Sequence, residues 1–228
     1  MSAEHAAADA SPVPADATAR RARGRPRKTA GERDDGNRRQ QLLRAAARLF
    51  RLQGFDATST RDIAAAVGMR SGSPFYHFEN KEALLAAVME EGMERALAHQ
   101  RAAMDAAVAA APAPLGARDC LRVLVRSHFD NLLGPESDHI PVMLYEWRVL
   151  SDAQKRAVNR LKDEYEAVWV PVLAALHRAG ALRGDPRVAR LMLFGALNWS
   201  AQWYVPNGRS SLDDLTDTAM QLFLKDAP

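Results

Sequence analysis

From Asn37 to the end of the chain, apolar residues recur three or four positions apart, and no stretch alternates apolar and polar side chains as a half-buried strand would. Glycine, proline and short polar runs interrupt this pattern at intervals, among them APAPLG, GPESD, RGDP and VPNGRSS. Such runs are typical of loops between helices. The sequence therefore predicts an all-α fold without internal repeats.

The chain is long and apolar enough to form a buried hydrophobic core. Of its 228 residues 47% are hydrophobic, enough for one or two domains. No run of eighteen apolar residues predicts a membrane span, and the N-terminus lacks the pattern of a secretory signal. The single cysteine, Cys120, cannot form an internal disulfide and is expected to fill apolar space. We expect a cytoplasmic protein.

Three segments of different composition suggest the domain organisation. Residues 1–36 contain almost no large apolar side chains and predict a disordered arm. Six cations and no acid lie between Arg20 and Lys28, although the whole chain carries a net charge of only +3. Residues 37–82 predict a compact unit of three helices, and residues 83–228 a larger helical domain. A local basic patch of this kind suits a polyanionic partner.

The first predicted helix begins at residue 37, where Asn37 and Gln40 form a plausible capping pair. Its apolar face has helical spacing, and Gly54 is expected to end it. The residues of this face are Leu42, Ala46, Leu49 and Phe50.

Capping residues also mark the next two helices. Ser59 and Asp62 predict the start of a short second helix, which Gly68 ends. Asn80 is expected to cap a long helix that begins at Lys81.

The segment RSGSPFYHF, Arg70 to Phe78, lies between these helices. Two short helices joined through a tight turn have the proportions of a helix-turn-helix. In that motif the second helix enters the DNA major groove. Pro74 falls near the end of the first turn, where a helix loses at most one backbone hydrogen bond. We therefore predict that this segment is a recognition helix.

The sequence around this motif resembles the DNA-binding domain of the TetR/AcrR family of bacterial regulators. The resemblance covers Arg38 to Met89 and is carried by AARLFRLQGFDATSTRDIAAAVGM, SGSPFYHF and ENKEALL. It implies a transcriptional regulator that binds double-stranded operator DNA. Arg70 and Pro74 depart from the residues common in the family, which bears on the operator sequence rather than on DNA binding.

The resemblance also implies which residues face DNA. Thr60 and Arg61 would contact the backbone and groove edge. Arg70, Ser71 and Ser73 would read the bases, and the small residues would let the helix approach them closely. The aromatic residues, His77 and Lys81 would position the duplex by phosphate contacts or by core packing. For His77 internal packing is an equal alternative, and for the arginines the alternative is a solvated surface charge. Beyond Thr60 and Arg61, the candidates are Arg70, Ser71, Gly72, Ser73, Phe75, Tyr76, His77 and Lys81.

The basic arm contains RGRPRK, Arg23 to Lys28, whose Arg-Gly-Arg-Pro core resembles an AT-hook. Arg23 and Arg25 would then enter a narrow minor groove, where negative potential is concentrated. The alternative is a nonspecific tether to phosphates. Both interpretations predict steep salt dependence.

The two terminal helices, expected over 186–204 and 211–225, have broad apolar faces. In the resembling family such a pair forms a dimer interface, and a dimer would present two recognition helices to successive major grooves. The alternative is ordinary monomer core. The interface candidates are Leu191, Phe194, Gly195, Leu212, Leu215, Ala219, Leu222 and Phe223.

The remaining helices suggest an effector pocket. Pro171 removes a backbone hydrogen bond inside an expected helix and should kink it, which opens space between neighbours. Ligand sites combine apolar walls with a few polar groups. Core packing is the alternative for each candidate. The candidates are His128, Met143, Glu146, Trp147, Tyr165, Trp169, Leu173, Asn198, Gln202 and Trp203.

The phrases GALNWSAQWYVPNG, YEWRVLS and DEYEAVW resemble a TetR subgroup that senses acyl-CoA thioesters. A CoA ligand would need cations for its phosphates, and Arg122, Arg126 and Arg148 are candidates, although surface solvation explains them equally.

We thus expect a homodimeric, ligand-responsive regulator, a repressor released from a palindromic operator by a small apolar or acyl-CoA effector. An architectural or effector-independent DNA-binding protein that uses the arm is the alternative. We expect no enzyme and no cofactor or metal, since the sequence contains no nucleophile elbow, phosphate loop, zinc-binding helix or dinucleotide fingerprint.

Overall fold

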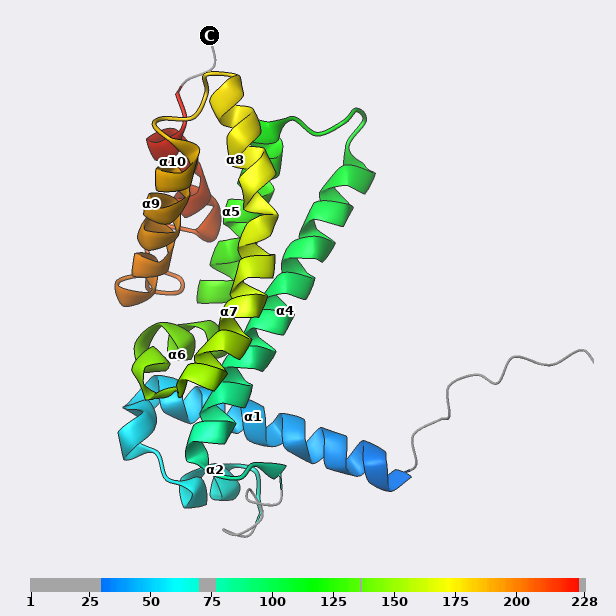
Figure 1. The fold of residues 1–228 in the computed structure, drawn as a ribbon, viewed down its shortest axis with the longest axis vertical. Coiled ribbons are helices and arrows are strands. Elements are labelled where there is room, and N and C mark those ends of the chain that lie inside the picture. Colours follow the sequence, from blue (N-terminus) through cyan, green and yellow to red (C-terminus); the bar gives the residue numbers. More distant parts are fainter. Residues whose placement is uncertain (1–29, 70–76, 136, 226–228) are drawn as a thin grey trace, which may run out of the picture.

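The computed structural model describes residues 30–69, 77–135 and 137–225, and these residues form an all-α protein (Figure 1). Within these ranges the only β-type pairing is an isolated bridge between Leu182 and Leu224. No described helix is long and apolar enough to cross a membrane. The predicted all-α class is confirmed.

The N-terminal helices lie at one end of the molecule (Figure 1). Helix α1 spans Ala30–Ala57 and therefore begins before Asn37, so the capping pair predicted from Asn37 and Gln40 is wrong. No proline lies between Pro26 and Ala57, so the helix can extend toward the N-terminus through Gly31 and Gly36 despite their low helix propensity. The predicted break at Gly54 is confirmed, because its φ of 82° and ψ of 166° suit only glycine.

Helix α2, Thr60–Ala66, begins as predicted. The Ser59 hydroxyl accepts from the backbone N–H of Asp62, and the Asp62 carboxylate accepts from that of Ser59 at 2.8 Å. Hydrogen bonds to this carboxylate from the Ser59 hydroxyl, at 2.6 Å, and from the Ser59 backbone N–H hold the pKa of Asp62 below its usual value. Gly68 follows the helix with a φ of 67°. The predicted recognition helix falls largely on residues 70–76, which lie outside the described residues.

The long helix α4, Lys81–Ala110, begins where predicted, since the Asn80 side chain accepts from Ala83 N–H at 2.7 Å. It connects the N-terminal helices to the rest of the molecule (Figure 1). At its middle, Gly92 lies so close to α6 that an added Cβ would stand 2.6 Å from the Cβ of His139. Glycine therefore permits close packing of these two helices.

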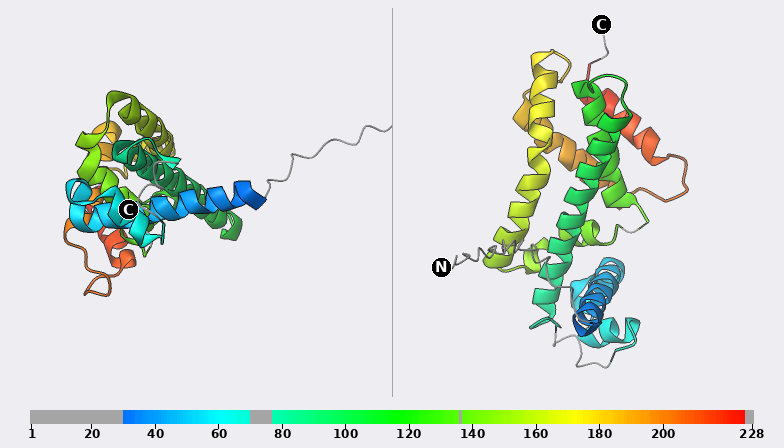
Figure 2. Two further views of the ribbon diagram at one scale, coloured as in Figure 1. Left: turned by 90° about the horizontal axis from the view of Figure 1, so that it is seen from below. Right: turned by 90° about the vertical axis from the view of Figure 1, so that its right-hand side faces the viewer.

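The C-terminal helices pack around α4 and α5 in the two views of Figure 2. Helix α5 contacts α4, α8, α9 and α10, and α4 also contacts α6 and α7. Short 3-10 turns follow α6 and α9 at Trp147–Val149 and Ser200–Gln202. The helices are α5 Ala117–Leu133, α6 His139–Glu146, α7 Asp152–Ala167, α8 Trp169–Arg178, α9 Pro186–Trp199 and α10 Leu212–Phe223.

The predicted kink at Pro171 is confirmed as an interruption between α7 and α8 at Val168. Proline cannot donate to the carbonyl four positions earlier, which belongs to Ala167. Asp185 and Pro186 also act as predicted. The Asp185 carboxylate accepts from the N–H groups of Arg187 and Val188, and proline occupies the first turn of α9.

One continuous apolar core joins the N-terminal helices to the C-terminal domain. Phe50 and Phe55 of α1 pack with their ring centroids 5.5 Å apart. Leu85 and Met89 of α4 are fully buried. Helices α4 and α6 both contact α1. A shift of either helix would therefore change the packing of α1.

Candidate functional site

A cavity of about 230 Å³ lies between α4, α5, α6, α7 and α9. Five helices contribute to it, so its walls come from segments far apart in the sequence. Its apolar wall combines Met93, Ile140, Met143, Leu191 and Phe194 with the small Ala96. Its polar groups belong to His128, Asn131, Lys162, Tyr165, Glu166 and Asn198.

His128 is the central polar group of this cavity. Its Nδ1 lies 3.0 Å from the Tyr165 hydroxyl and its Nε2 lies 3.1 Å from Oδ1 of Asn198. Because the amide oxygen only accepts, Nε2 carries the proton and Nδ1 accepts from the tyrosine hydroxyl. Burial lowers the pKa of His128 to about 4 and raises the pKa of Tyr165. Both groups are therefore neutral at pH 7.

Aromatic rings hold His128 in this position. The ring centroids of Trp169 and Phe194 lie 6.0 and 5.3 Å from that of the imidazole, both in edge-on arrangements. Trp169 itself is fixed by a hydrogen bond of 2.7 Å from its Nε1 to Oε1 of Gln100. These aromatic contacts fix the position of His128 and its polar partners. A fixed neutral donor and acceptor suit the binding of a neutral carbonyl or hydroxyl group.

The charged residues at the cavity neutralise one another. Glu166 forms an ion pair with Arg190 and lies 3.7 Å from Lys162. Its side chain is 15% exposed, so this pairing occurs in a partly dehydrated place. The inner part of the cavity is thus apolar with neutral hydrogen-bonding groups.

The structure brings together four of the predicted ligand residues, His128, Met143, Tyr165 and Asn198. Trp169 and Leu173 are buried, and Trp169 supports the cavity from behind. The structure does not bring the other four to this cavity: Glu146, Trp147, Gln202 and Trp203.

Two of these four have other roles or positions. Gln202 donates to the Tyr145 hydroxyl at 2.7 Å, and Trp203 is 53% exposed. Sequence reasoning missed Asn131 and Glu166 as lining residues, since a lone amide or carboxylate on a helix carries no signal of its own.

Glu146, at the end of α6, contacts the N-terminal helices instead. Its Oε1 accepts from the backbone N–H of Phe55 at 3.0 Å. A second link lies nearby, where Arg51 of α1 pairs with Asp138 before α6 at 2.9 Å. Helix α6 therefore lines the cavity with Ile140 and Met143. Residues at both ends of α6, Asp138 and Glu146, also bind α1.

On the predicted DNA-binding side, Thr60 and Arg61 begin α2, and Arg61 is exposed. His77 is half-buried, with its ring centroid 6.5 Å from that of the buried Phe78. The remaining candidates lie outside the described residues: Arg23, Arg25, Arg70, Ser71, Gly72, Ser73, Phe75 and Tyr76.

Lys81 has a structural role, which was the packing alternative of its prediction. Its Nζ donates to the carbonyl oxygens of Phe55 and Thr58 at 2.8 and 2.9 Å. The same Nζ lies 4.1 Å from the centroid of the Phe55 ring. The cation therefore ties together two carbonyls at the junction between α1 and α2, where the helical hydrogen-bond pattern ends.

The predicted interface residues divide into three groups by exposure. Leu191 and Leu222 are 63% and 65% exposed, and Gly195 is also exposed. Ala219 is buried in the monomer, as the core alternative holds. The other four are partly buried against the core: Phe194, Leu212, Leu215 and Phe223.

An exposed apolar face runs along α9. Val188, Met192 and Trp199 follow helical spacing and are 58%, 65% and 66% exposed. No added Cβ at Gly195, between them, would meet another atom within 4 Å. This face differs from the one that lines the cavity through Phe194 and Asn198.

The arginines predicted to hold phosphates have other partners in part. Arg122 pairs with Asp217, and Arg126 pairs with Asp213, so both arginines connect α5 to α10. Arg126 also pairs with Asp130 within α5. Arg148 is exposed. Within the described residues, no group of His, Cys, Asp or Glu could hold a metal ion.

Comparison with known proteins agrees with this architecture. A family model described as bacterial regulatory proteins, tetR family, matches residues 42–88. A second, described as tetracyclin repressor-like, C-terminal domain, matches residues 114–227.

Curated relatives match most of the chain. The transcriptional repressor KstR2 of Mycolicibacterium smegmatis is 30% identical over 193 residues, which cover 82% of this chain and 89% of the repressor. KstR2 of Rhodococcus jostii is 28% identical, with the same coverage.

Two solved structures share the fold. Superantigen PfiT is 37% identical with a TM-score of 0.68, covering 83% of this chain and 97% of its own. AibR, in complex with isovaleryl coenzyme A and operator DNA, is 24% identical with a TM-score of 0.71, covering 82% and 97%, and shows the fold alone. The helix-turn-helix end, the C-terminal helical domain and these matches together place the chain in the tetR family of bacterial regulatory proteins.

Proposed function

We propose that the protein is a transcriptional repressor that binds operator DNA as a homodimer and is released by a small effector in the cavity at His128. The relatives named as transcriptional repressors support this proposal, as does the N-terminal helix-turn-helix family match. The protein would act in the cytoplasm, where bacterial DNA lies.

One observation carries the proposal: α6 belongs to the cavity and to the domain contact at once. Ile140 and Met143 line the cavity, and Glu146, one turn further, accepts from Phe55 of α1. A ligand that displaces α6 would therefore change the position of α1. Such a ligand must prefer the conformation that does not fit the operator, because equal affinity for both conformations shifts nothing.

The cavity also limits the effector. Its volume of about 230 Å³ is below the roughly 300–1,000 Å³ typical of small-molecule sites. It therefore suits a small molecule or the apolar end of a larger one. Neutral His128 and Asn198 can serve a carbonyl oxygen or hydroxyl. A free carboxylate would lose its hydration there without gaining an unpaired cation, because Lys162 and Arg190 already pair with Glu166.

A thioester end meets these conditions, because it is apolar and carries an uncharged carbonyl. AibR was solved with isovaleryl coenzyme A, and the acyl-CoA class is the one the sequence resembles. We therefore propose an acyl thioester as the effector class.

The test is an electrophoretic mobility shift of the full chain on DNA upstream of its own gene, with a panel of acyl-CoAs and the matching free acids. Coupling of about 1–3 kcal/mol predicts that an effector weakens operator binding roughly 5–150-fold. The free acids should act more weakly. If no compound changes the shift, the protein is not an effector-released repressor.

The basic run from Arg20 to Lys28 favours a second candidate, an effector-independent DNA-binding protein. Deletion of residues 1–29 separates the two, since it leaves the described α1 intact. A repressor would keep specific operator binding at reduced affinity, whereas the second candidate would lose binding altogether.

A further inference from the structure

We propose that the cleft between α1 and α4 binds the phosphate-bearing end of the effector, whose apolar end lies in the cavity at His128. The proposal rests on the proposed function for the apolar end. It adds a site of different chemistry in another part of the molecule, lined by residues of both domains.

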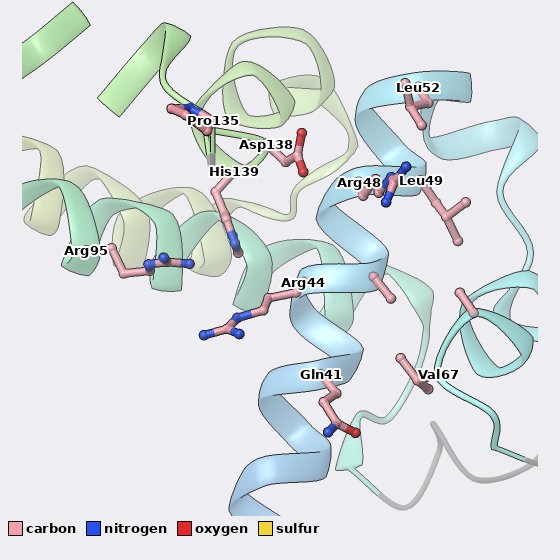
Figure 3. A pocket seen from close by; sticks show the side chains of 12 residues that line it. Gln41, Arg44, Arg48, Leu49, Leu52, Val67, Arg95, Pro135, Asp138 and His139 are labelled. Atoms are coloured by element: carbon pink, nitrogen blue, oxygen red, sulfur yellow. The ribbon is translucent and has the colours of Figure 1, made fainter. Parts of the chain in front are cut away.

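The cleft is larger than the cavity and lies where the two domains meet. It has a volume of about 900 Å³ and is lined by α1, the end of α2, α4 and the segment before α6. Figure 3 shows the side chains of Arg44 from α1 and Arg95 from α4 pointing into the same space, with His139 between them. Arg48 lies one turn further along α1.

The charge of the cleft favours an anion. Its described lining residues include three arginines and one carboxylate, Asp138. That carboxylate is already paired with Arg51, which does not line the cleft. Burial lowers the pKa of His139, which donates through Nδ1 to the carbonyl of Val88, so the imidazole is neutral and the positive charge of the cleft comes from its arginines. Guanidinium groups from two helices can bind phosphate oxygens bidentately.

A groove of about 580 Å³ lies between the cleft and the cavity. It shares Arg95, Pro135 and His139 with the cleft. It shares Ala96, Asn131 and Ile140 with the cavity. The three spaces therefore follow one another along α4, and only the residues shared by groove and cavity separate them.

The partition between groove and cavity is slight. Ala96 has a short side chain, and Asn131 closes the remaining space by donating to the Ala96 carbonyl at 3.3 Å. This distance is long for an N–H···O hydrogen bond, and the same side chain also interacts with the Tyr165 hydroxyl in the cavity. Rotation of Asn131 would let a chain through and would free its amide to bind that chain.

The ligand class that fits this path has an apolar acyl end, an extended polar middle and a phosphate-bearing end. Such a ligand would contact α1 directly through Arg44 and Arg48 while its acyl end displaces α6. Phosphate binding in the cleft would therefore act on the DNA-binding domain itself, in addition to the contact of Glu146 with Phe55.

The experiment measures ligand binding to the full chain by isothermal titration calorimetry, without DNA. The probes are octanoyl-CoA, free CoA and pantetheine, which lacks the phosphates. The wild type should bind free CoA at least about tenfold more tightly than pantetheine, with an affinity that falls as salt rises. The double variant Arg44→Ala/Arg48→Ala should lose about tenfold or more in affinity for free CoA and nothing for pantetheine.

The matched control is Arg101→Ala, which removes an exposed arginine of α4 that lines neither the cleft, the groove nor the cavity. It should bind all three probes as the wild type does. Both arginines in the double variant are exposed, and a thermal unfolding curve checks that the variant is folded. The proposal is overturned if the double variant binds free CoA like the wild type, or if the wild type does not distinguish CoA from pantetheine.

A phosphate-free thioester separates this proposal from the proposed function. Octanoyl-N-acetylcysteamine can occupy the cavity but cannot reach the cleft with an anion. If it releases operator DNA while the arginine variants leave CoA binding unchanged, the effector response stands and the cleft proposal fails. If the arginine variants lose CoA binding while no thioester releases DNA, the cleft site stands and the effector response fails.

Discussion

The backbone N–H of Phe55 donates to the carboxylate of Glu146 at 3.0 Å, although the two residues are 91 positions apart. Phe55 follows the break at Gly54, where the backbone leaves the helical conformation and its N–H groups lose their helical acceptors. The C-terminal domain thus supplies the acceptor that the N-terminal helices lack. This hydrogen bond is part-buried and lies one turn from Met143 of the cavity.

Glu146→Ala should weaken the communication between effector and operator. Loss of the acceptor leaves the Phe55 N–H without this partner, at a cost of about 1–3 kcal/mol in the free energy of unfolding. We also expect the ratio of operator affinities without and with effector to fall toward one. Urea unfolding and mobility shifts with an active acyl-CoA measure the two effects.

Glu146→Gln is the control for that experiment, since its amide oxygen can still accept from Phe55. It should retain most of the stability and most of the effector response. A wild-type response in Glu146→Ala would show that the signal takes another route.

Lys81 and Arg61 should behave in opposite ways. Lys81→Met removes the two hydrogen bonds to the carbonyls of Phe55 and Thr58 and should lower the free energy of unfolding by about 1–3 kcal/mol. Arg61→Ala should leave stability unchanged and reduce operator affinity, with a salt dependence about one unit less steep. Denaturant titration and operator binding over a salt series test the pair. If Lys81→Met loses as much operator affinity as Arg61→Ala and keeps its stability, Lys81 contacts phosphate instead.

The helix starts that sequence predicted well are those set by local chemistry. Ser59 with Asp62, Asn80, and Asp185 before Pro186 each act within three residues of their own backbone. Such signals need no knowledge of the rest of the fold. The start of α1 lacked a comparable marker, and the helix extends to Ala30.

The candidate site was predictable only in part, because packing decides which face of a helix points where. The apolar character of α9 was evident, but its residues divide between the cavity, at Phe194 and Asn198, and solvent, at Met192. Glu146 was assigned to the ligand because it shares a helix with Met143. Its partner Phe55 could not be found from spacing along the chain.

Stability should depend on pH through His128. Its pKa is lowered to about 4 by burial, whereas an unfolded histidine has a pKa of about 6.5. Below pH 6.5 this histidine is protonated in the unfolded chain but stays neutral in the folded chain. The contribution of His128 to stability is therefore greatest above pH 6.5. Between pH 6.5 and 4 the loss from this residue reaches about 3 kcal/mol.

Urea unfolding at pH 7 and pH 5 measures this loss, and His128→Gln should reduce the difference between the two values. The variant keeps an amide that can bond to Tyr165 or Asn198 but does not titrate. Some dependence should remain, because burial also lowers the pKa of His139. An unchanged difference in His128→Gln would exclude His128 as its source.

The exposed face of α9 should hold two copies of the chain together. Met192 is 65% exposed between Val188 and Gly195 on this face, and a lysine there would place a charge in an apolar interface. Met192→Lys should therefore have a solution mass near 25.1 kDa, where the wild type has twice that mass. Val170→Lys is the matched control, because Val170 is 53% exposed on α8, outside this face.

Light scattering coupled to size-exclusion chromatography at low micromolar concentration gives the masses. The monomeric variant should also lose operator affinity, since a single recognition helix no longer has a linked partner in the next major groove. A dimeric Met192→Lys, or a monomeric Val170→Lys, would place the interface elsewhere on the molecule. Because Phe194 and Asn198 of α9 line the cavity and Met192 does not, ligand binding to the monomeric variant would then report on the effector site without the dimer.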